Sequence, residues 1–250
     1  MVWHHWLPLV VFVVTFVASI LSGMAGGGGG FIITPFLIAI GLTPQQSIAT
    51  GKLGALGLDG GAIAAFRHRA NRHRKLTVTL ICLAFVIGIV SSFGIRHIGN
   101  DHLQLIMGIF NLAMVPLLFV KHHGLKSRRR HYLLQALGLG AIIVTMLVQG
   151  IFSSGIGSLI NVFLILFFGV LALDANIMKR KSSLVSDVVV LVGLAGSGLI
   201  NIQYGLISSA AGLAGGYIGS KFALREGEKF ARYALMVFMV VSGVWLIATA

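Results

Sequence analysis

The sequence predicts an all-α, polytopic integral membrane protein with about eight to ten hydrophobic helices in two inverted repeats, some of them broken or re-entrant. Three observations predict this class: an apolar composition, a series of long uncharged runs, and a likeness between the two halves. Of the 250 residues, 57% are hydrophobic and 10% are charged, whereas soluble domains carry roughly 25% charge. The mean hydropathy of +0.96 therefore excludes an ordinary soluble protein.

Long uncharged runs recur along the chain and end at glycines, prolines or clustered charges. Because a spanning helix needs about 20 mostly apolar residues, each run predicts one or two helices. The expected segments are 7–24, 28–41, 45–66, 76–95, 102–120, 132–150, 155–172, 182–200, 204–222 and 230–249.

The basic residues separate these segments and indicate their orientation. The net charge is +13, and 17 of the 19 basic residues lie in the stretches 67–75, 121–131, 179–181 and 221–232. Short basic loops between apolar segments are typical of the cytoplasmic side of a membrane protein rather than of nucleic-acid binding. Because these stretches follow the third, fifth, seventh and ninth segments, we predict a multi-pass protein of the cell (plasma or inner) membrane with both termini outside.

The two halves of the chain are alike at glycines and at charges. Displacements of 127 or 128 residues align Gly28 with Gly155, Lys52 with Arg180, and Asp59 with Asp187. The charged pairs carry weight because the whole chain has only six acids. Residues 1–125 are therefore predicted as repeat 1 and residues 126–250 as repeat 2. Five segments in each half invert the second repeat, and inverted repeats place substrate sites near the bilayer midplane.

Five consecutive glycines, at 26–30, form the densest local signal. Glycine costs roughly 1 kcal/mol against alanine in a helix interior, so the backbone is expected to open there. Opened backbone inside a bilayer is tolerated where it lines a polar cavity, and amides at the start of a half-helix attract anions. The candidate substrate ligands at these breaks are Gly27, Gly28, Gly29 and Gly30, with Gly155 and Gly157 in the second half. Close helix packing through small residues is the alternative, and it is favoured for 212–219.

A charged pattern lies inside the expected third segment. Thr43 before Pro44 predicts a helix start, which puts Lys52 about two turns into an apolar helix, with Asp59 seven residues further on the same face. An ammonium at that depth needs a carboxylate, a cavity or an anion. The pattern is compatible with an internal Lys52–Asp59 ion pair and with charged side chains that line the substrate pathway.

The second half repeats this pattern with a basic stretch and a later acid. Lys179 and Arg180 are expected near the cytoplasmic face, either as positive-inside residues or as anion ligands. Asp187 lies in an uncharged run and is interpreted as a proton carrier, a counter-ion of Arg180 or a helix-terminus ligand. Neutral hydrogen bonds to a substrate are expected from Thr34, Thr50, Asn161 and Asn176.

No enzyme, cofactor or bound metal is expected. The serines between 149 and 158 have no histidine after His131 to act as an embedded base. The nine histidines follow no metal-binding pattern, and the chain has a single cysteine.

These motifs in this order resemble the sulfite exporter TauE/SafE family of membrane proteins. The resemblance rests on the glycine run followed by Pro35, on Ala-Thr-Gly-Lys at 49–52, on the motif at 175–186, and on Gly-Gly-Tyr-Ile-Gly-Ser at 215–220. It covers nearly the whole chain. The second half departs from the pattern because Ser-Ser-Gly-Ile-Gly-Ser stands where a fuller glycine run is expected.

The resemblance implies a secondary carrier that exports or exchanges a small anion such as sulfite, a sulfonate or a related organic acid. Its partners would be that anion and the lipid bilayer, with a homodimer left open and nucleic acid not expected. Lys52, Lys179 and Arg180 would supply positive charge, and Asp59 and Asp187 are the candidates for proton coupling. Two alternatives stay open: a cation or metal carrier that uses the two aspartates, and a non-transport membrane scaffold.

Overall fold

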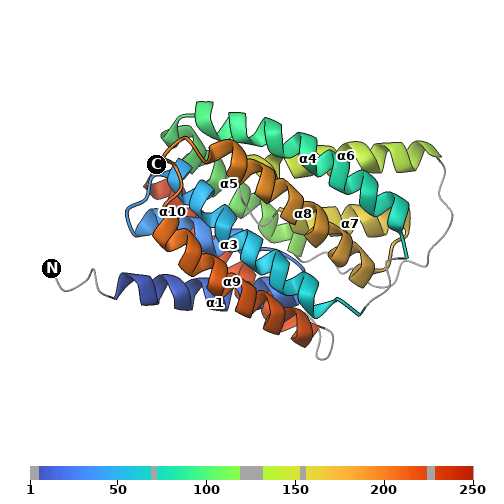
Figure 1. Ribbon diagram of the computed structural model, residues 1–250, viewed down its shortest axis with the longest axis horizontal. Coiled ribbons are helices and arrows are strands. Elements are labelled where there is room, and N and C mark those ends of the chain that lie inside the picture. Colours follow the sequence, from blue (N-terminus) through green and yellow to red (C-terminus); the bar gives the residue numbers. More distant parts are fainter. Residues whose placement is uncertain (1–5, 69–71, 119–131, 153–155, 224–228, 250) are drawn as a thin grey trace.

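The computed structural model is a bundle of helices that run largely along one direction (Figure 1). It describes residues 6–68, 72–118, 132–152, 156–223 and 229–249. Within these ranges the regular structure is entirely α-helical, as the composition predicts. The helices are α1 (Leu7–Ala25), α2 (Gly30–Ala39), α3 (Pro44–Ala65), α4 (Arg74–His97), α5 (Asn100–Leu118), α6 (Tyr132–Phe152), α7 (Gly157–Phe168), α8 (Ala172–Leu194), α9 (Ile202–Ala223) and α10 (Lys229–Ala248).

Three helices, α1, α4 and α6, are long and apolar enough to cross a membrane by length and composition. Many of their large apolar side chains face outward, such as Phe85, Val86 and Phe93 on α4, which are 52–58% exposed. An apolar exterior of this extent is stable in lipid and not in water. The protein is therefore an all-α polytopic membrane protein, as the sequence predicts.

Two helices are too short to cross a bilayer alone. At 1.5 Å per residue, the 10 residues of α2 and the 12 residues of α7 span only about 15–18 Å, and the hydrocarbon core is about 30 Å thick. α2 follows a break in the helical backbone, and α7 begins at Gly157, after the described end of α6 at Phe152. α1 ends in the left-handed Gly26 (φ 79°), and Gly28 has a φ of 106°, so the glycine run opens the backbone as predicted.

The centre of the bundle is built on α3, and its start agrees with the sequence prediction. Thr43 accepts a hydrogen bond from the Gln46 amide while the Gln46 side chain accepts one from the Thr43 amide, which closes a capping box. α3 packs closely on α9 (Figure 1). A Cβ on Gly212 or Gly216 would overlap the α3 backbone at Gly54 or Leu58, so the glycines of 212–219 do serve helix packing.

One boundary differs strongly from the prediction. α8 begins at Ala172, ten residues before the expected start at 182. The basic stretch 179–181 is therefore not a loop but the second and third turns of a helix, and the side chains of Lys179 and Arg180 are 5% and 0% exposed. The sequence prediction ends a membrane helix at charged residues, yet a helix with a buried polar face carries charge in its interior.

Candidate functional site

Five charged side chains are buried together where α3 crosses α8 near the middle of the bundle. They are Lys52 and Asp59 of α3, and Lys179, Arg180 and Asp187 of α8, none more than 5% exposed. Buried charges are expensive unless they are paired or meet a ligand. The partners of each charge therefore define what this centre can do.

The ion pairs cross from one helix to the other. Lys52 Nζ lies 2.8 Å from Asp187 Oδ1, and Arg180 Nη1 lies 2.6 Å from Asp59 Oδ1. The internal Lys52–Asp59 pair and the Asp187–Arg180 pair considered from the sequence are both wrong. Asp59 lies seven residues after Lys52 on α3, and Arg180 lies seven residues before Asp187 on α8. The two helices therefore cross antiparallel, and the acid of each helix pairs with a cation of the other.

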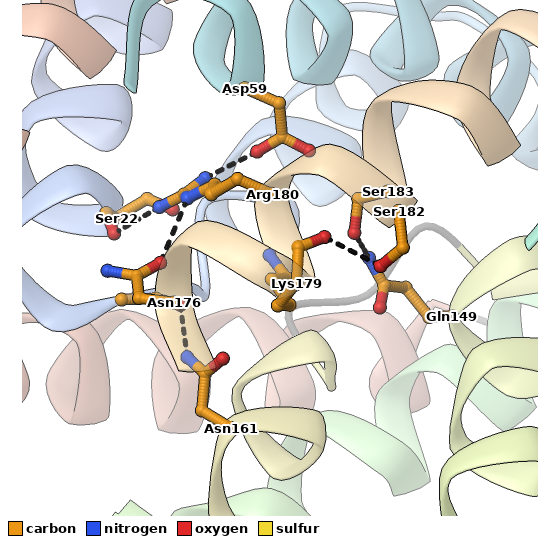
Figure 2. A network of polar contacts seen from close by, with 10 residues as sticks. Ser22, Asp59, Gln149, Asn161, Asn176, Lys179, Arg180, Ser182 and Ser183 are labelled. Carbon is orange, nitrogen blue, oxygen red and sulfur yellow. Dashed lines mark hydrogen bonds and ion pairs between the residues drawn. The ribbon is translucent and has the colours of Figure 1, made fainter. Parts of the chain in front are cut away.

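Arg180 is held by a dense set of partners, as Figure 2 shows. Besides Asp59, its Nη2 donates to the Ser22 carbonyl at 2.8 Å and its Nε donates to Asn176 Oδ1 at 3.3 Å. Ser22 belongs to the last turn of α1, just before the glycine break. The guanidinium therefore ties α1, α3 and α8 together in directions that its planar fork provides.

Lys52 has fewer partners than Arg180. Beyond Asp187, its ammonium donates one further hydrogen bond within the described residues, a longer one of 3.4 Å to the backbone carbonyl of Gln149 on α6. A polar cavity of about 10 Å³ adjoins the pair, lined by Lys52, Asp187, Gln149 and the serines 182, 183 and 186. One water-sized group occupies roughly that volume.

Lys179 is the charge left over when the pairs are counted. Both carboxylates are engaged with other cations, and in the described part of the chain the Lys179 ammonium forms no ion pair. The cluster thus holds three cations and two carboxylates, with a formal charge of +1. A buried site with one uncompensated positive charge is stabilised by an anion.

A larger cavity, of about 50 Å³, lies beside Lys179 and Arg180. It has space for roughly three or four water-sized groups. Gly28, Gly29 and Gly30 line it, and the first bonded amide of α2 is that of Phe31, which donates to the Gly28 carbonyl. The three glycine amides precede that bond, so helix geometry leaves them without a carbonyl of α2 to bind, and they carry the positive end of its dipole.

Gly157, at the start of α7, lines the same cavity. A Cβ at this position would lie 2.6 Å from Gln149 Oε1 and 2.6 Å from Lys179 Cε. Only glycine allows the start of α7 to approach these two side chains so closely. Both half-helices therefore contribute to one polar cavity, which lies between the charges of α3 and α8.

The remaining predicted residues have different positions. Thr34 lines the larger cavity, and its hydroxyl is buried with no partner in the described part of the chain. Thr50 accepts a hydrogen bond from the Asn201 amide, Asn161 donates to the Gly26 carbonyl, and Asn176 accepts from Arg180. These three residues support the site from outside the cavity. A Cβ on Gly27 would lie 3.2 Å from the backbone nitrogen of Ser158, and Gly155 lies outside the described residues.

The sequence did not identify Gln149 and Ser22 as site residues. Gln149 lines both cavities, its Nε2 donates to Ser183 Oγ, and its Oε1 is buried without a partner in the described residues. The available signal was an amide side chain in an uncharged run just before a break. The contribution of Ser22 is its backbone carbonyl, which residue type does not reveal.

Buried charges, half-helices and a polar cavity inside an apolar bundle define the class of a membrane transport protein. Comparison with known families agrees, because residues 11–246 match the family described as Sulfite exporter TauE/SafE. The chain belongs to this family, which confirms the resemblance found in the sequence.

Curated relatives extend over nearly the whole chain. A "Probable membrane transporter protein" of Haemophilus influenzae is 28% identical over 94% of this chain and 93% of its own. A protein of the same description from Methanocaldococcus jannaschii is 25% identical, over 96% and 95%, and one from Escherichia coli K12 is 23% identical, over 93% and 86%. No solved structure matches the chain. The protein is a membrane transporter of the TauE/SafE family.

Proposed function

We propose that this transporter exports or exchanges a small anion such as sulfite, a sulfonate or a related organic acid. The observation that carries the proposal is the uncompensated charge of the buried cluster, three cations against two carboxylates. Lys179 lines the larger cavity together with Arg180 and the glycine amides that begin α2. An ammonium, a guanidinium and free amides are the groups that bind oxyanions.

The proposed direction follows from the charge of the substrate. An inside-negative membrane potential drives a monoanion outward by about 2.3 kcal/mol per 100 mV, so export needs no coupled ion. Uptake would need one, and Asp59 and Asp187 remain the proposed proton carriers for that case. Even without 179–181, basic residues gather after odd-numbered segments, in the stretches 67–75, 121–131 and 221–232. We therefore retain cytoplasmic basic loops and outer termini in a plasma or inner membrane.

Inverted repeats, 1–125 and 126–250, are part of the same proposal. Exchanging position 52 with 180 and position 59 with 187 converts one ion pair into the other. Contacts between α3 and α9 have their counterpart in those between α8 and α4. A two-fold axis in the membrane plane accounts for both relations.

The cation alternative is less well supported by the contacts. Asp59 and Asp187 each face a cation at ion-pair distance, and a divalent metal ion prefers several free oxygen ligands. The scaffold alternative predicts that every buried charge is paired and that no polar cavity exists. Lys179 and the cavity beside it argue against that alternative.

Efflux from proteoliposomes tests the proposal. The purified chain is reconstituted, the vesicles are loaded with sulfite or sulfoacetate, and efflux is followed at an imposed potential. We expect protein-dependent efflux that is faster when the interior is negative, with no competition from external divalent cations. Metal-ion counterflow in place of anion efflux would overturn the proposal.

A further inference from the structure

Two of the described residues are shared by the two cavities. Gln149 and Asp187 line both of them, whereas the remaining lining residues belong to one cavity or the other. The Asp187 carboxylate, bound to Lys52, therefore stands between the larger cavity and the smaller one. The cations are divided between the two cavities: Lys179 and Arg180 line the larger one, and Lys52 lines the smaller one.

Apart from the Asp187 carboxylate, the polar groups that line the smaller cavity suit an anion. Its polar lining consists of the Lys52 ammonium, the amide of Gln149, three serine hydroxyls and the carboxylate of Asp187. Ser183 accepts a hydrogen bond from Gln149 Nε2, so its own proton can be donated to a ligand. Ser182 donates to the Lys179 carbonyl, which leaves Ser183 and Ser186 as the two hydroxyls that suit an anion.

Asp187 occupies the place that an anion would take. A carboxylate and a small oxyanion offer the same charged oxygen acceptors to an ammonium. Removing one partner of a buried ion pair is strongly unfavourable, but exchanging it for another anion is not. The limited hydrogen bonding of Lys52, compared with that of Arg180, makes this the pair in which exchange is feasible.

We propose that the Lys52 ammonium, with the Ser183 and Ser186 hydroxyls, is a second station for the transported anion, and that Asp187 is the internal carboxylate that the anion displaces there. The inference rests on the proposed function and deepens it. An anion bound beside Lys179 moves past Gln149 to Lys52 as Asp187 leaves, so the pair closes the passage whenever the second station is empty.

A double-mutant cycle on the purified full chain tests the second station. The variants are Asp187→Asn, Ser186→Ala and both together, and the measurement is the Kd of sulfite by calorimetry. Asp187→Asn replaces the ion pair of Lys52 by a weaker neutral contact that an anion displaces more easily, so we expect sulfite to bind about tenfold more tightly, the size of one charge-assisted hydrogen bond. Ser186→Ala is expected to remove most of that gain, because the anion then loses a hydroxyl donor.

Two matched controls separate this from a general change in charge. In the Asp59→Asn background, Ser186→Ala should leave the Kd of sulfite unchanged, because Arg180 belongs to the larger cavity. Ser47 of α3 is fully buried and lines neither cavity, so Ser47→Ala should not change the gain of Asp187→Asn. Unchanged binding in Asp187→Asn, or a gain that survives Ser186→Ala, overturns the second station.

A second measurement applies even where Asp187→Asn does not fold. Ser186→Ala alone should slow sulfite exchange in proteoliposomes several-fold without altering the Kd of the resting protein, whereas Ser47→Ala should exchange like wild type. Wild-type exchange in Ser186→Ala contradicts the second station and leaves anion transport intact. A wild-type chain that neither binds nor exchanges sulfite or sulfoacetate contradicts the proposed function itself.

Discussion

The two buried ion pairs join the same two helices but differ in their surroundings. Arg180 reaches Asp59, the Ser22 carbonyl and Asn176 at once and is fully buried. Among the described residues, Lys52 reaches Asp187 and one carbonyl at 3.4 Å, so its pair is held by fewer contacts than that of Arg180. We infer from this difference that related positions in the two halves have separate tasks: the Arg180 pair holds three helices together beside the larger cavity, and the Lys52 pair exchanges partners.

Removal of the arginine should have the largest effect on the fold. Arg180→Ala leaves Asp59 buried and unpaired, and breaking a buried pair in this way costs about 3–5 kcal/mol. We expect a sharply lower melting temperature and little monodisperse protein in size-exclusion chromatography. The melting temperature of Arg180→Lys, which retains the charge but not the planar guanidinium, should lie between those of Arg180→Ala and wild type. A melting temperature for Arg180→Ala equal to that of wild type would remove the distinction between the pairs.

Removal of the lysine should affect transport more than stability. In Lys52→Ala, Asp187 can be solvated from the neighbouring cavity, so the melting temperature should fall less than in Arg180→Ala. Sulfite efflux should decrease at least tenfold, as expected for the loss of a charge-assisted contact. Equal efflux from Lys52→Ala and wild type would exclude Lys52 from the mechanism.

Neutralising Lys179 should separate transport from stability most cleanly. This ammonium forms no ion pair in the described residues, and a buried unpaired charge is unfavourable, so Lys179→Gln should melt at or above the wild-type temperature. Efflux should nevertheless fall about tenfold, because the charge that attracts the anion is lost. Lys181→Gln, two residues along and outside both cavities, is the matched control and should transport normally.

A methyl group at the start of α7 should have the smallest effect. Gly157→Ala would press on Gln149 and Lys179, and overpacking of this kind costs about 1–3 kcal/mol. We expect a modest fall in melting temperature and weaker sulfite binding. At Gly140 of α6 an added Cβ meets nothing within 4 Å, so Gly140→Ala should leave binding unchanged. Weaker binding in both variants would point to a general helix effect instead.

Much of the fold follows from the sequence because its signals are local. The glycine run opens the backbone whatever its surroundings, and Thr43 with Pro44 specifies a helix start through contacts within four residues. The predicted start of α8 is wrong because the rule that ends a membrane helix at charged residues assumes that those residues face water. At Arg180 the rule fails, since the helix buries that face against α1 and α3.

The partners within the site depend on packing between distant segments, which the sequence does not state. Lys52 and Asp59 lie on one face of α3, so the sequence left an internal pair open as one of two expectations. Only the antiparallel crossing with α8 brings Asp187 to Lys52, across 135 positions of sequence. Gln149 was not predicted for the same reason, because its position between the two cavities depends on how distant helices pack.

Calorimetric titration of the detergent-solubilised full chain with sulfite tests the central claim, that the buried cluster carries one positive charge in excess and binds an anion through it. We predict saturable binding of one sulfite per chain, reduced at least tenfold in Lys179→Gln and unaffected in Lys181→Gln. Sulfite binding of equal strength in wild type and Lys179→Gln would contradict the claim.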